Sequence, residues 1–252
     1  MKQEEFFEML EHLDEKYVVE AEEPVKKSRR KVRKYAVVLG LAAACLCLFV
    51  FGGRRIELSR YSKGVRASYA FFVPSIGVEA CLVQLTEEEL FTEWSDIIVK
   101  GTVKKIDNIK LNFNGDTMYR ALADIQVEKV YHGKCTEGKT IRVLLPGAVT
   151  AGIHSSIMDT LGRLEVGMTG IFMPRAYGID SVYQSNGAIL YLGDLAPYGF
   201  GDGIRFAFLE TKDGLVFDES AYVGAQGAHN LEDIEAYIYE MLELYLEEEK
   251  AE

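Results

Sequence analysis

The stretch from Lys26 to Gly53 constrains this chain more than any other. It opens with seven cations and continues into seventeen residues, 35–51, that carry no charge and no strongly polar side chain. At 1.5 Å per residue, a helix of this length measures about 25 Å, which is at the short end of what crosses a bilayer core. A helix satisfies its own backbone hydrogen bonds in hydrocarbon, so one span is sufficient. The sequence therefore predicts a single transmembrane helix over 35–53.

Positive charge sets the orientation of this predicted anchor. The C-terminal flank over 54–66 carries five basic residues, but they are more widely spaced than the seven on the N-terminal side. Because cations are retained on the cytoplasmic side, we expect the N-terminus in the cytoplasm and the rest of the chain outside the cell. The anchor residues are Tyr35, Leu39, Leu41, Leu46, Leu48, Phe49 and Phe51. The orienting cations are Lys26, Lys27, Arg29, Arg30, Lys31, Arg33 and Lys34.

Three alternatives compete with an uncleaved anchor. A cleaved secretory signal has a short basic region and a small-x-small cleavage site, whereas here 34 residues precede the apolar run. A lipoprotein signal would use Leu41–Cys45, which loosely resembles a lipobox, although the run stays apolar for six further residues. A buried core helix is seldom entered through seven cations. The anchor, and with it a cell-membrane location, remains the interpretation that we favour.

The anchor divides the chain into four parts. Residues 1–34 form a cytoplasmic segment, 35–53 the anchor, 54–77 a stalk and 78–252 an extracellular domain. Beyond residue 53 the chain holds thirty acidic and nineteen basic residues, a net charge of −11. Such acidity disfavours direct binding of nucleic acid outside the membrane.

The cytoplasmic segment contains one helical pattern, between Glu4 and Glu20. Acidic residues separate its apolar positions, which is typical of an amphipathic helix with an acidic face. A short helix of this kind is marginal alone in water, so it either docks on a cytoplasmic partner or remains a frayed, charged tail. The apolar docking positions are Phe6, Met9, Leu10, Leu13 and Tyr17.

Leu13–Ala21 reads LDEKYVVEA and is followed by the basic block and the apolar run. This arrangement resembles the N-terminus of membrane-anchored anti-sigma-factor-like proteins of Gram-positive anaerobes. The resemblance implies a cytoplasmic sigma factor, or another regulator, as a partner that is held at the membrane.

The extracellular part shows mostly strand patterns, with a helix at each end. Thr86 and Glu89 form a capping box that opens a short helix ending at Trp94. Residues 119–130 alternate so that Ala121, Ala123, Ile125 and Val127 share one face. A hairpin loop is predicted over 108–117, around Asn114-Gly115-Asp116. Strands are predicted at 78–85, 95–103, 119–130, 140–145, 164–173, 187–192, 204–210 and 215–217.

Four of these segments read SDIIVKGTV, ADIQVEKVYHGK, GKTIRVLLPG and LEVGMTGIFM. Their order resembles the small β-barrel of oligonucleotide/oligosaccharide-binding (OB) type, in its secreted tissue-inhibitor and netrin-like form. The resemblance implies a mainly antiparallel barrel, and short strands with Gly turns agree with a closed barrel. We thus predict a membrane-anchored α+β protein with an OB-like barrel outside the membrane.

A final amphipathic helix is predicted over 231–249, with Asn230 as its N-cap and acidic residues in its first turn. Its apolar stripe either covers one flank of the barrel or pairs with a partner helix.

No constellation of residues meets the needs of catalysis or metal binding. His132, His154 and His229 lie far apart in sequence, without the spacing of metal ligands. His154-Ser155-Ser156 with Asp159 indicates an exported hydrolase by residue type alone. We therefore expect no enzyme activity, no cofactor and no metal. Four aspartates are too irregularly spaced for a calcium loop, namely Asp194, Asp202, Asp213 and Asp218.

Two further features leave alternatives open. Cys81 and Cys135 either form a disulfide outside the cell or remain two isolated thiols. A group of aromatic residues offers either a platform for a carbohydrate or peptide, or ordinary barrel packing: Tyr177, Tyr183, Tyr191, Tyr198, Phe200 and Phe206.

The sequence thus predicts a single-pass membrane protein with an extracellular binding or sensing β-domain and a short cytoplasmic docking helix, and the N-terminal resemblance implies an anti-sigma-type regulator. The first alternative is a surface-anchored ligand-binding module without a signalling role, and the second is the exported hydrolase. The ligand outside the cell is not identified by any motif.

Overall fold

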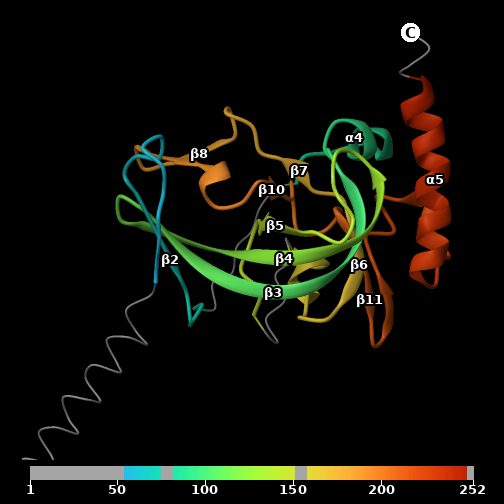
Figure 1. The fold of residues 1–252 in the computed structure, drawn as a ribbon, viewed down its shortest axis with the longest axis horizontal. Coiled ribbons are helices and arrows are strands. Elements are labelled where there is room, and N and C mark those ends of the chain that lie inside the picture. The colour runs from blue at the N-terminus through green and yellow to red at the C-terminus, as the bar shows by residue number, and fades with distance from the viewer. Residues whose placement is uncertain (1–53, 75–81, 151–157, 249–252) are drawn as a thin grey trace, which may run out of the picture. The chain divides into compact units, whose positions relative to one another are not determined.

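The computed structural model describes residues 54–74, 82–150 and 158–248, which form a curled, mostly antiparallel sheet with a helix at its C-terminal end (Figure 1). The prediction of a mainly β domain with a C-terminal helix is confirmed. The strands are β1 (Arg55–Ile56), β2 (Val65–Tyr69), β3 (Ile98–Phe113), β4 (Asp116–His132), β5 (Thr140–Leu145), β6 (Thr169–Phe172), β7 (Arg175–Ala176), β8 (Val182–Ser185), β9 (Ala188–Tyr191), β10 (Tyr198–Gly199), β11 (Ala207–Thr211) and β12 (Gly214–Val216). The helices are α4 (Glu87–Thr92) and α5 (Leu231–Glu248), with short 3-10 turns η2 (Leu161–Arg163), η3 (Leu192–Asp194) and η4 (Val223–Ala225).

The long hairpin of β3 and β4 is the centre of the sheet. Its turn is only Asn114-Gly115, both with positive φ (49° and 115°), as a tight two-residue hairpin requires. The predicted loop over 108–117 is therefore wrong, because β3 continues to Phe113 and β4 begins at Asp116. Three irregularities in the register between Ile98 and Lys105 allow the first half of β3 to bend.

The order of the strands brings the two ends of the sheet toward one another. β6 pairs with the first half of β3 and β2 with its second half, while β4 pairs with β5 and β5 with β10. The chain then passes from β10 to β11, which pairs with β6. Of these pairings only β5–β10 is parallel. The sheet therefore curls back on itself from β6 through β3, β4 and β5 to β10.

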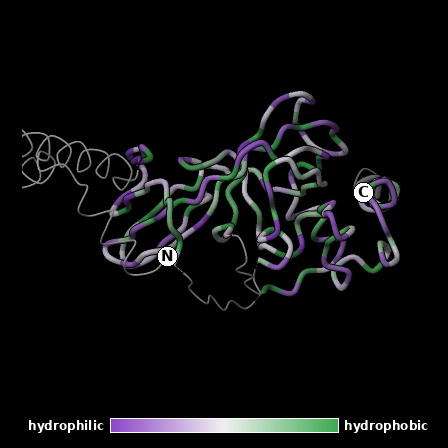
Figure 2. Tube along the Cα trace, turned by 90° about the horizontal axis from the view of Figure 1, so that it is seen from below, coloured by the Kyte–Doolittle hydropathy of each residue, from purple (hydrophilic) through white to green (hydrophobic). Residues whose placement is uncertain are grey.

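One face of the curled sheet encloses the main core. The predicted inward face of β4 is confirmed, since Ala121, Ala123, Ile125 and Val127 are all almost completely buried in this core. The strands carry hydrophobic and hydrophilic residues in alternation (Figure 2). Gly101 of β3 faces Gly170 of β6, and a Cβ on Gly101 would lie 2.5 Å from the Gln126 carbonyl oxygen. These glycines permit the close approach of strands in the bend.

The opposite face of the sheet builds a second core at the far end of the hairpin. The register change between Val103 and Lys105 turns the apolar residues of β3 to the other face from Ile109 onward. The β8–β9 hairpin covers them, and a bridge between Lys63 and Ile189 connects it to the segment before β2. The buried members are Ala67, Ile109, Leu111, Phe113, Leu122, Leu144, Ala188, Leu190, Leu195 and Ala196.

The two helices predicted within the described residues both form, and α5 covers the flank of the main core. Asn230 caps α5 by accepting a 2.9 Å hydrogen bond from the Asp233 amide at its Oδ1. Ile234 and Ile238 are fully buried, so the apolar stripe of α5 packs on the flank of the curled sheet rather than on a partner helix. The capping box of α4 also forms between Thr86 and Glu89.

Three predicted boundaries need correction. The segment 54–77 is not a stalk over its described part, because β1 and β2 belong to the main sheet. Residues 82–85 of the predicted strand 78–85 form no strand, and Val83 is 63% exposed. The predicted strand 164–173 begins only at Thr169, because Gly167 takes a positive φ of 93° in the preceding turn.

The predicted anchor over 35–53 and the cytoplasmic segment 1–34 lie outside the described residues. Among the helices that the structure does describe, none is long and apolar enough to span a membrane.

Candidate functional site

The residues singled out for chemistry do not converge on one site. His154, Ser155 and Ser156 lie outside the described residues, and Asp159 is bound to Arg163. Within 54–74, 82–150 and 158–248, no group of three or more His, Cys, Asp or Glu side chains is placed to hold a metal ion.

The four aspartates considered as calcium ligands have separate roles. Asp194 accepts hydrogen bonds from the hydroxyls of Ser59 and Ser62, at 3.0 and 2.6 Å, and so ties η3 to the segment before β2. Asp202 forms a buried ion pair, Asp213 lies on an exposed hairpin turn, and Asp218 accepts from Ser220.

The aromatic group forms packing rather than a platform. Phe200 and Phe206 are buried in the main core, and Tyr198 packs against it. Tyr177 and Tyr183 pack on the second core. The remaining member, Tyr191, is half-buried beside Tyr61, with ring centroids 6.2 Å apart. The packing alternative therefore describes these side chains.

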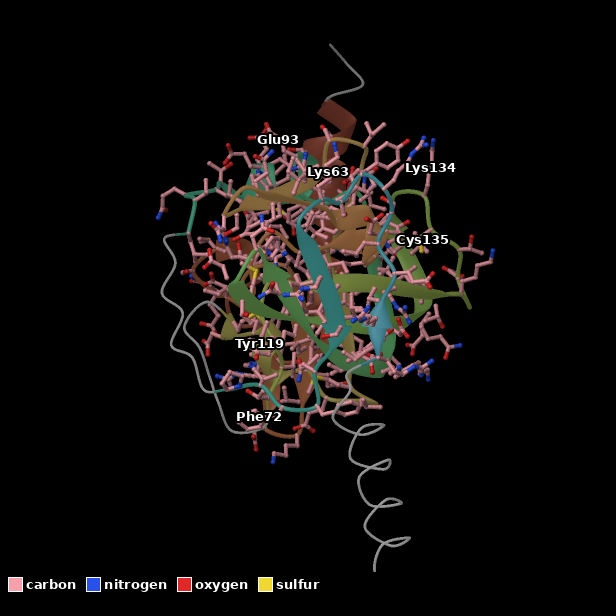
Figure 3. All side chains as sticks on the ribbon, turned by 90° about the vertical axis from the view of Figure 1, so that its left-hand side faces the viewer. Lys63, Phe72, Glu93, Tyr119, Lys134 and Cys135 are labelled. Atoms are coloured by element: carbon pink, nitrogen blue, oxygen red, sulfur yellow. The ribbon has the colours of Figure 1, made fainter. Side chains whose placement is uncertain are left out.

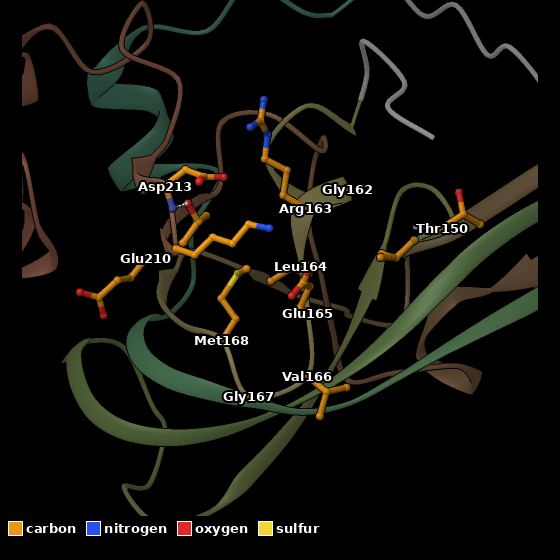
Figure 4. A pocket seen from close by; sticks show the side chains of 13 residues that line it. Thr150, Gly162, Arg163, Leu164, Glu165, Val166, Gly167, Met168, Glu210 and Asp213 are labelled. Atoms are coloured by element: carbon orange, nitrogen blue, oxygen red, sulfur yellow. Dashed lines mark hydrogen bonds between the residues drawn. The ribbon is translucent and has the colours of Figure 1, made fainter. Parts of the chain in front are cut away.

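A hollow lies at the rim of the curled sheet and is called the rim groove here (Figure 4). Its volume is about 600 Å³, within the range of small-molecule sites. Two residues after β5, the turn before β6 and the β11–β12 turn contribute to it. The lining residues are Val149, Thr150, Gly162, Arg163, Leu164, Glu165, Val166, Gly167, Met168, Glu210, Thr211, Lys212 and Asp213.

Hydrogen bonds hold both turns of the rim groove in place. The Gly167 amide donates to the Val103 carbonyl oxygen at 2.8 Å, and the Val103 amide donates to the Met168 carbonyl oxygen at 2.9 Å. On the other turn, the Thr211 hydroxyl donates to the Gly214 carbonyl oxygen at 2.7 Å and accepts from the Asp213 amide at 3.2 Å. The turns before β6 and between β11 and β12, which supply most of the lining, are thus fixed by hydrogen bonds.

The groove presents charges of both signs beside an apolar floor. Buried Leu164 and half-buried Met168 supply the floor. Lys212, Glu165 and Glu210 form no ion pair with any residue that the structure describes. Arg163, in contrast, is engaged, because its guanidinium donates to the Asp159 carbonyl oxygen at 2.9 Å and to its carboxylate at 3.3 Å. Groups of both charges therefore remain available to a ligand.

A shallower hollow of about 440 Å³ lies over the outer face of β4 and β5. Its charged residues satisfy one another, since Arg142 donates to both carboxylate oxygens of Asp124, at 2.7 and 2.9 Å. This hydrogen bonding lowers the pKa of Asp124 below its ordinary value and raises that of Arg142. A ligand here would have to compete with an existing ion pair.

Most of the predicted functional residues lie outside the described ranges. They include the anchor over 35–53, the orienting cations over 26–34 and the docking positions over 6–17. Cys135 is half-buried against the main core, but Cys81 lies outside the description, so the disulfide stays a prediction. The groove residues were not predicted as a site, because only the fold brings the turns at Gly167 and Gly214 together.

Comparison of the chain with protein-family models, with curated proteins and with solved structures finds no match.

Proposed function

We propose that this protein is a membrane-anchored binding module whose outer domain holds a small polar ligand in the rim groove. The observation that carries this proposal is the meeting of unpaired charges of both signs above an apolar floor, in a groove formed by fixed turns. Pre-formed pockets that combine apolar walls with a few polar groups are typical binding sites. The anchor is supported by the apolar run over 35–53 and its flanking cations.

We also propose that the curled sheet is a barrel of OB type. Support comes from the strand order, in which β10 lies beside β5 and β11 beside β6. If β10 and β11 are counted as one strand interrupted over 200–206, five strands close a ring: β3, β4, β5, the interrupted strand and β6. Small Greek-key barrels of this kind serve widely as binding modules, although a fold alone does not assign a ligand.

The charges of the groove favour a zwitterionic ligand, such as an amino acid, a short peptide with free termini or a substituted amino sugar. An anionic group of such a ligand would lie at the Lys212 ammonium, and its ammonium group near Glu165 or Glu210. Hydrogen bonds to charged groups contribute about 1.5–3 kcal/mol each, so loss of one partner weakens binding measurably.

Thermal-shift screening of the purified protein with free amino acids, dipeptides and amino sugar phosphates tests this proposal, followed by calorimetric titration of the hits. We expect Lys212→Gln and Glu165→Gln each to weaken binding by at least tenfold. Lys139→Gln is the matched control, because Lys139 is exposed and lies outside the groove. A hit that binds all three variants as tightly as the wild type would place the site elsewhere.

For the cytoplasmic segment we propose docking of a partner on the apolar stripe of residues 6–17, as in anti-sigma-type regulation. The pattern at Leu13–Ala21 supports this part of the proposal. Crosslinking from native membranes, with the intact protein and a form lacking residues 1–23, tests it. Selective loss of one cytoplasmic protein, a sigma factor above all, would support docking, whereas an unchanged set of partners would contradict it.

A further inference from the structure

At the end of the sheet formed by β2 and the second half of β3, one face is contacted in the described chain by the segment after β5 at Asn108, and it is exposed at Arg66 and Lys110. In β2 and the end of β3 the residues alternate strictly, and those that point inward build the second core. The outward residues on the same strands are polar or charged. Figure 3 looks onto this end of the molecule, where Tyr119 and Phe72 are labelled.

The register places three cations together on this outward face. Arg55 of β1 pairs with Ser68, Ser68 pairs with Lys110 of β3, and Lys110 pairs with Tyr119 of β4. Paired residues of antiparallel strands point to the same side, so these four form one row across the sheet. Arg66 lies in the neighbouring row and donates to the Asn112 side chain at 3.3 Å. We call Arg55, Arg66 and Lys110 the cationic face.

Within the part of the chain that the structure describes, these cations have no acidic partner. All three are exposed, and none forms an ion pair with a residue that the structure describes. Arg66 and Lys110 are diagonal neighbours on adjacent strands, a spacing of about 7–8 Å between Cα atoms, and like charges so placed repel. An unpaired cluster of cations is notable where the chain beyond residue 53 has a net charge of −11.

An exposed aromatic pair lies at the same end of the sheet. Phe71 and Phe72 follow β2 and are 73% and 78% exposed. The Tyr69 amide donates to the Arg54 carbonyl oxygen at 2.9 Å, so the point where the described chain begins lies two residues from this pair. The predicted anchor ends at residue 53, directly before Arg54.

We propose that the cationic face and Phe71–Phe72 rest on the membrane surface, where the cations contact the anionic headgroups of phospholipids. Aromatic side chains favour the headgroup region, and each Lys or Arg near an anionic surface adds about 1 kcal/mol, or roughly fivefold, to membrane affinity. Contact with anionic lipid relieves the repulsion among the three cations. This inference rests on the proposed anchor, which holds Arg54 close to the bilayer.

Hydrogen exchange of the full-length protein in lipid nanodiscs tests the contact. We expect amides of residues 65–73 to exchange at least fivefold more slowly in discs that contain phosphatidylglycerol than in discs of phosphatidylcholine alone. The triple variant Arg55→Gln, Arg66→Gln, Lys110→Gln should abolish the difference, as should high salt. The control variant Lys134→Gln, Lys139→Gln, Arg175→Gln removes the same charge at exposed positions elsewhere, and it should still show slower exchange in the discs that contain phosphatidylglycerol.

Several outcomes would overturn the inference. Equal exchange of residues 65–73 in the two kinds of disc would overturn it. So would a control variant that loses the difference between the discs as completely as the triple variant of the cationic face does. Protection by soluble heparin but not by phosphatidylglycerol would assign the face to an acidic polymer instead. Co-elution of protein and discs tests the anchor separately. If the protein does not co-elute, flotation with phosphatidylglycerol vesicles decides whether the cationic face binds lipid on its own.

Discussion

Arg205 and Asp202 form the most buried ion pair among the residues that the structure describes, with side chains 9% and 7% exposed. The Asp202 carboxylate accepts from the amides of Ile204 and Arg205, both at 2.8 Å, as well as from the guanidinium. The same guanidinium donates to the Val83 carbonyl oxygen at 2.9 Å. The pair thus fixes the crossing from β10 to β11 and holds the segment before α4 against it.

Replacement of Arg205 by a neutral residue should therefore destabilise the fold strongly. We expect Arg205→Met to lower the free energy of unfolding by about 3–5 kcal/mol, because Asp202 stays buried without its counter-ion. Urea denaturation followed by circular dichroism measures the change. Arg163→Met is the control, since the exposed pair with Asp159 contributes at most about 1 kcal/mol. Equal effects of the two substitutions would contradict this account of the buried pair.

The Asp124–Arg142 pair should make stability depend on pH at the acidic end. Arg142 depresses the pKa of Asp124 on folding, so the pair stabilises the fold above the unfolded pKa of about 4 and ceases to do so as pH falls through the depressed value. The difference in unfolding free energy between wild type and Arg142→Gln should be constant from neutral pH to about pH 5 and shrink below about pH 4. Urea titrations across this range measure it, and a difference that does not change with pH would contradict the assignment.

At the scale of elements, α5 owes its position to one apolar face and to polar contacts with β4 and with α4, where the hydroxyls of Tyr237 and Tyr245 donate to the Glu87 carboxylate. Ile238 is fully buried in the main core, whereas Leu244 is 46% exposed. Glu235 is bound by Lys129 and accepts from the Tyr131 hydroxyl at 3.0 Å. We expect Ile238→Ala to lower the free energy of unfolding by about 2–5 kcal/mol. Leu244→Ala, measured by the same denaturant titration, should change it by no more than about 0.5 kcal/mol, and a larger effect would mean that this face of α5 also has a partner.

The elements that could be predicted from the sequence are those with strong local signals. The alternation over 119–130, the capping box at Thr86 and the N-cap at Asn230 each lead directly to the observed element. The β1–β2 pair was missed because its outward residues are mostly basic and polar, which hides the alternation of Val65, Ala67 and Tyr69. The segment over 164–168 has apolar residues like those of a strand, but the positive φ of Gly167 makes it a turn.

The second core and the rim groove could not be predicted for a different reason. Both depend on contacts between segments far apart in sequence. The second core needs the register change after Val103, which exchanges the inward and outward residues of β3. The groove needs the turns at Gly167 and Gly214 to meet beside Val149. Local sequence patterns predict neither the register change in β3 nor the approach of these two turns.

At the scale of the whole described domain, two cores of unequal size share one hairpin. The main core has thirty-one buried residues and the second core ten, and they lie on opposite faces of the sheet. The far end, with β1, β2, β8 and β9, therefore has fewer buried contacts to keep it closed. Regions of this kind open by local unfolding at a lower free energy than the main core does.

We therefore expect the two ends of the domain to respond differently to matched cavities. Leu190→Ala in the second core should accelerate amide exchange in β1, β2, β8 and β9 while β5, β6 and β11 keep their protection, because the cavity weakens only local closure. Ile125→Ala in the main core should accelerate exchange in all of them, since it lowers global stability. Native-state hydrogen exchange with mass spectrometry resolves these segments. Uniform acceleration by Leu190→Ala would mean that the domain unfolds as one unit, and that the end that carries the cationic face opens no more readily than the main core.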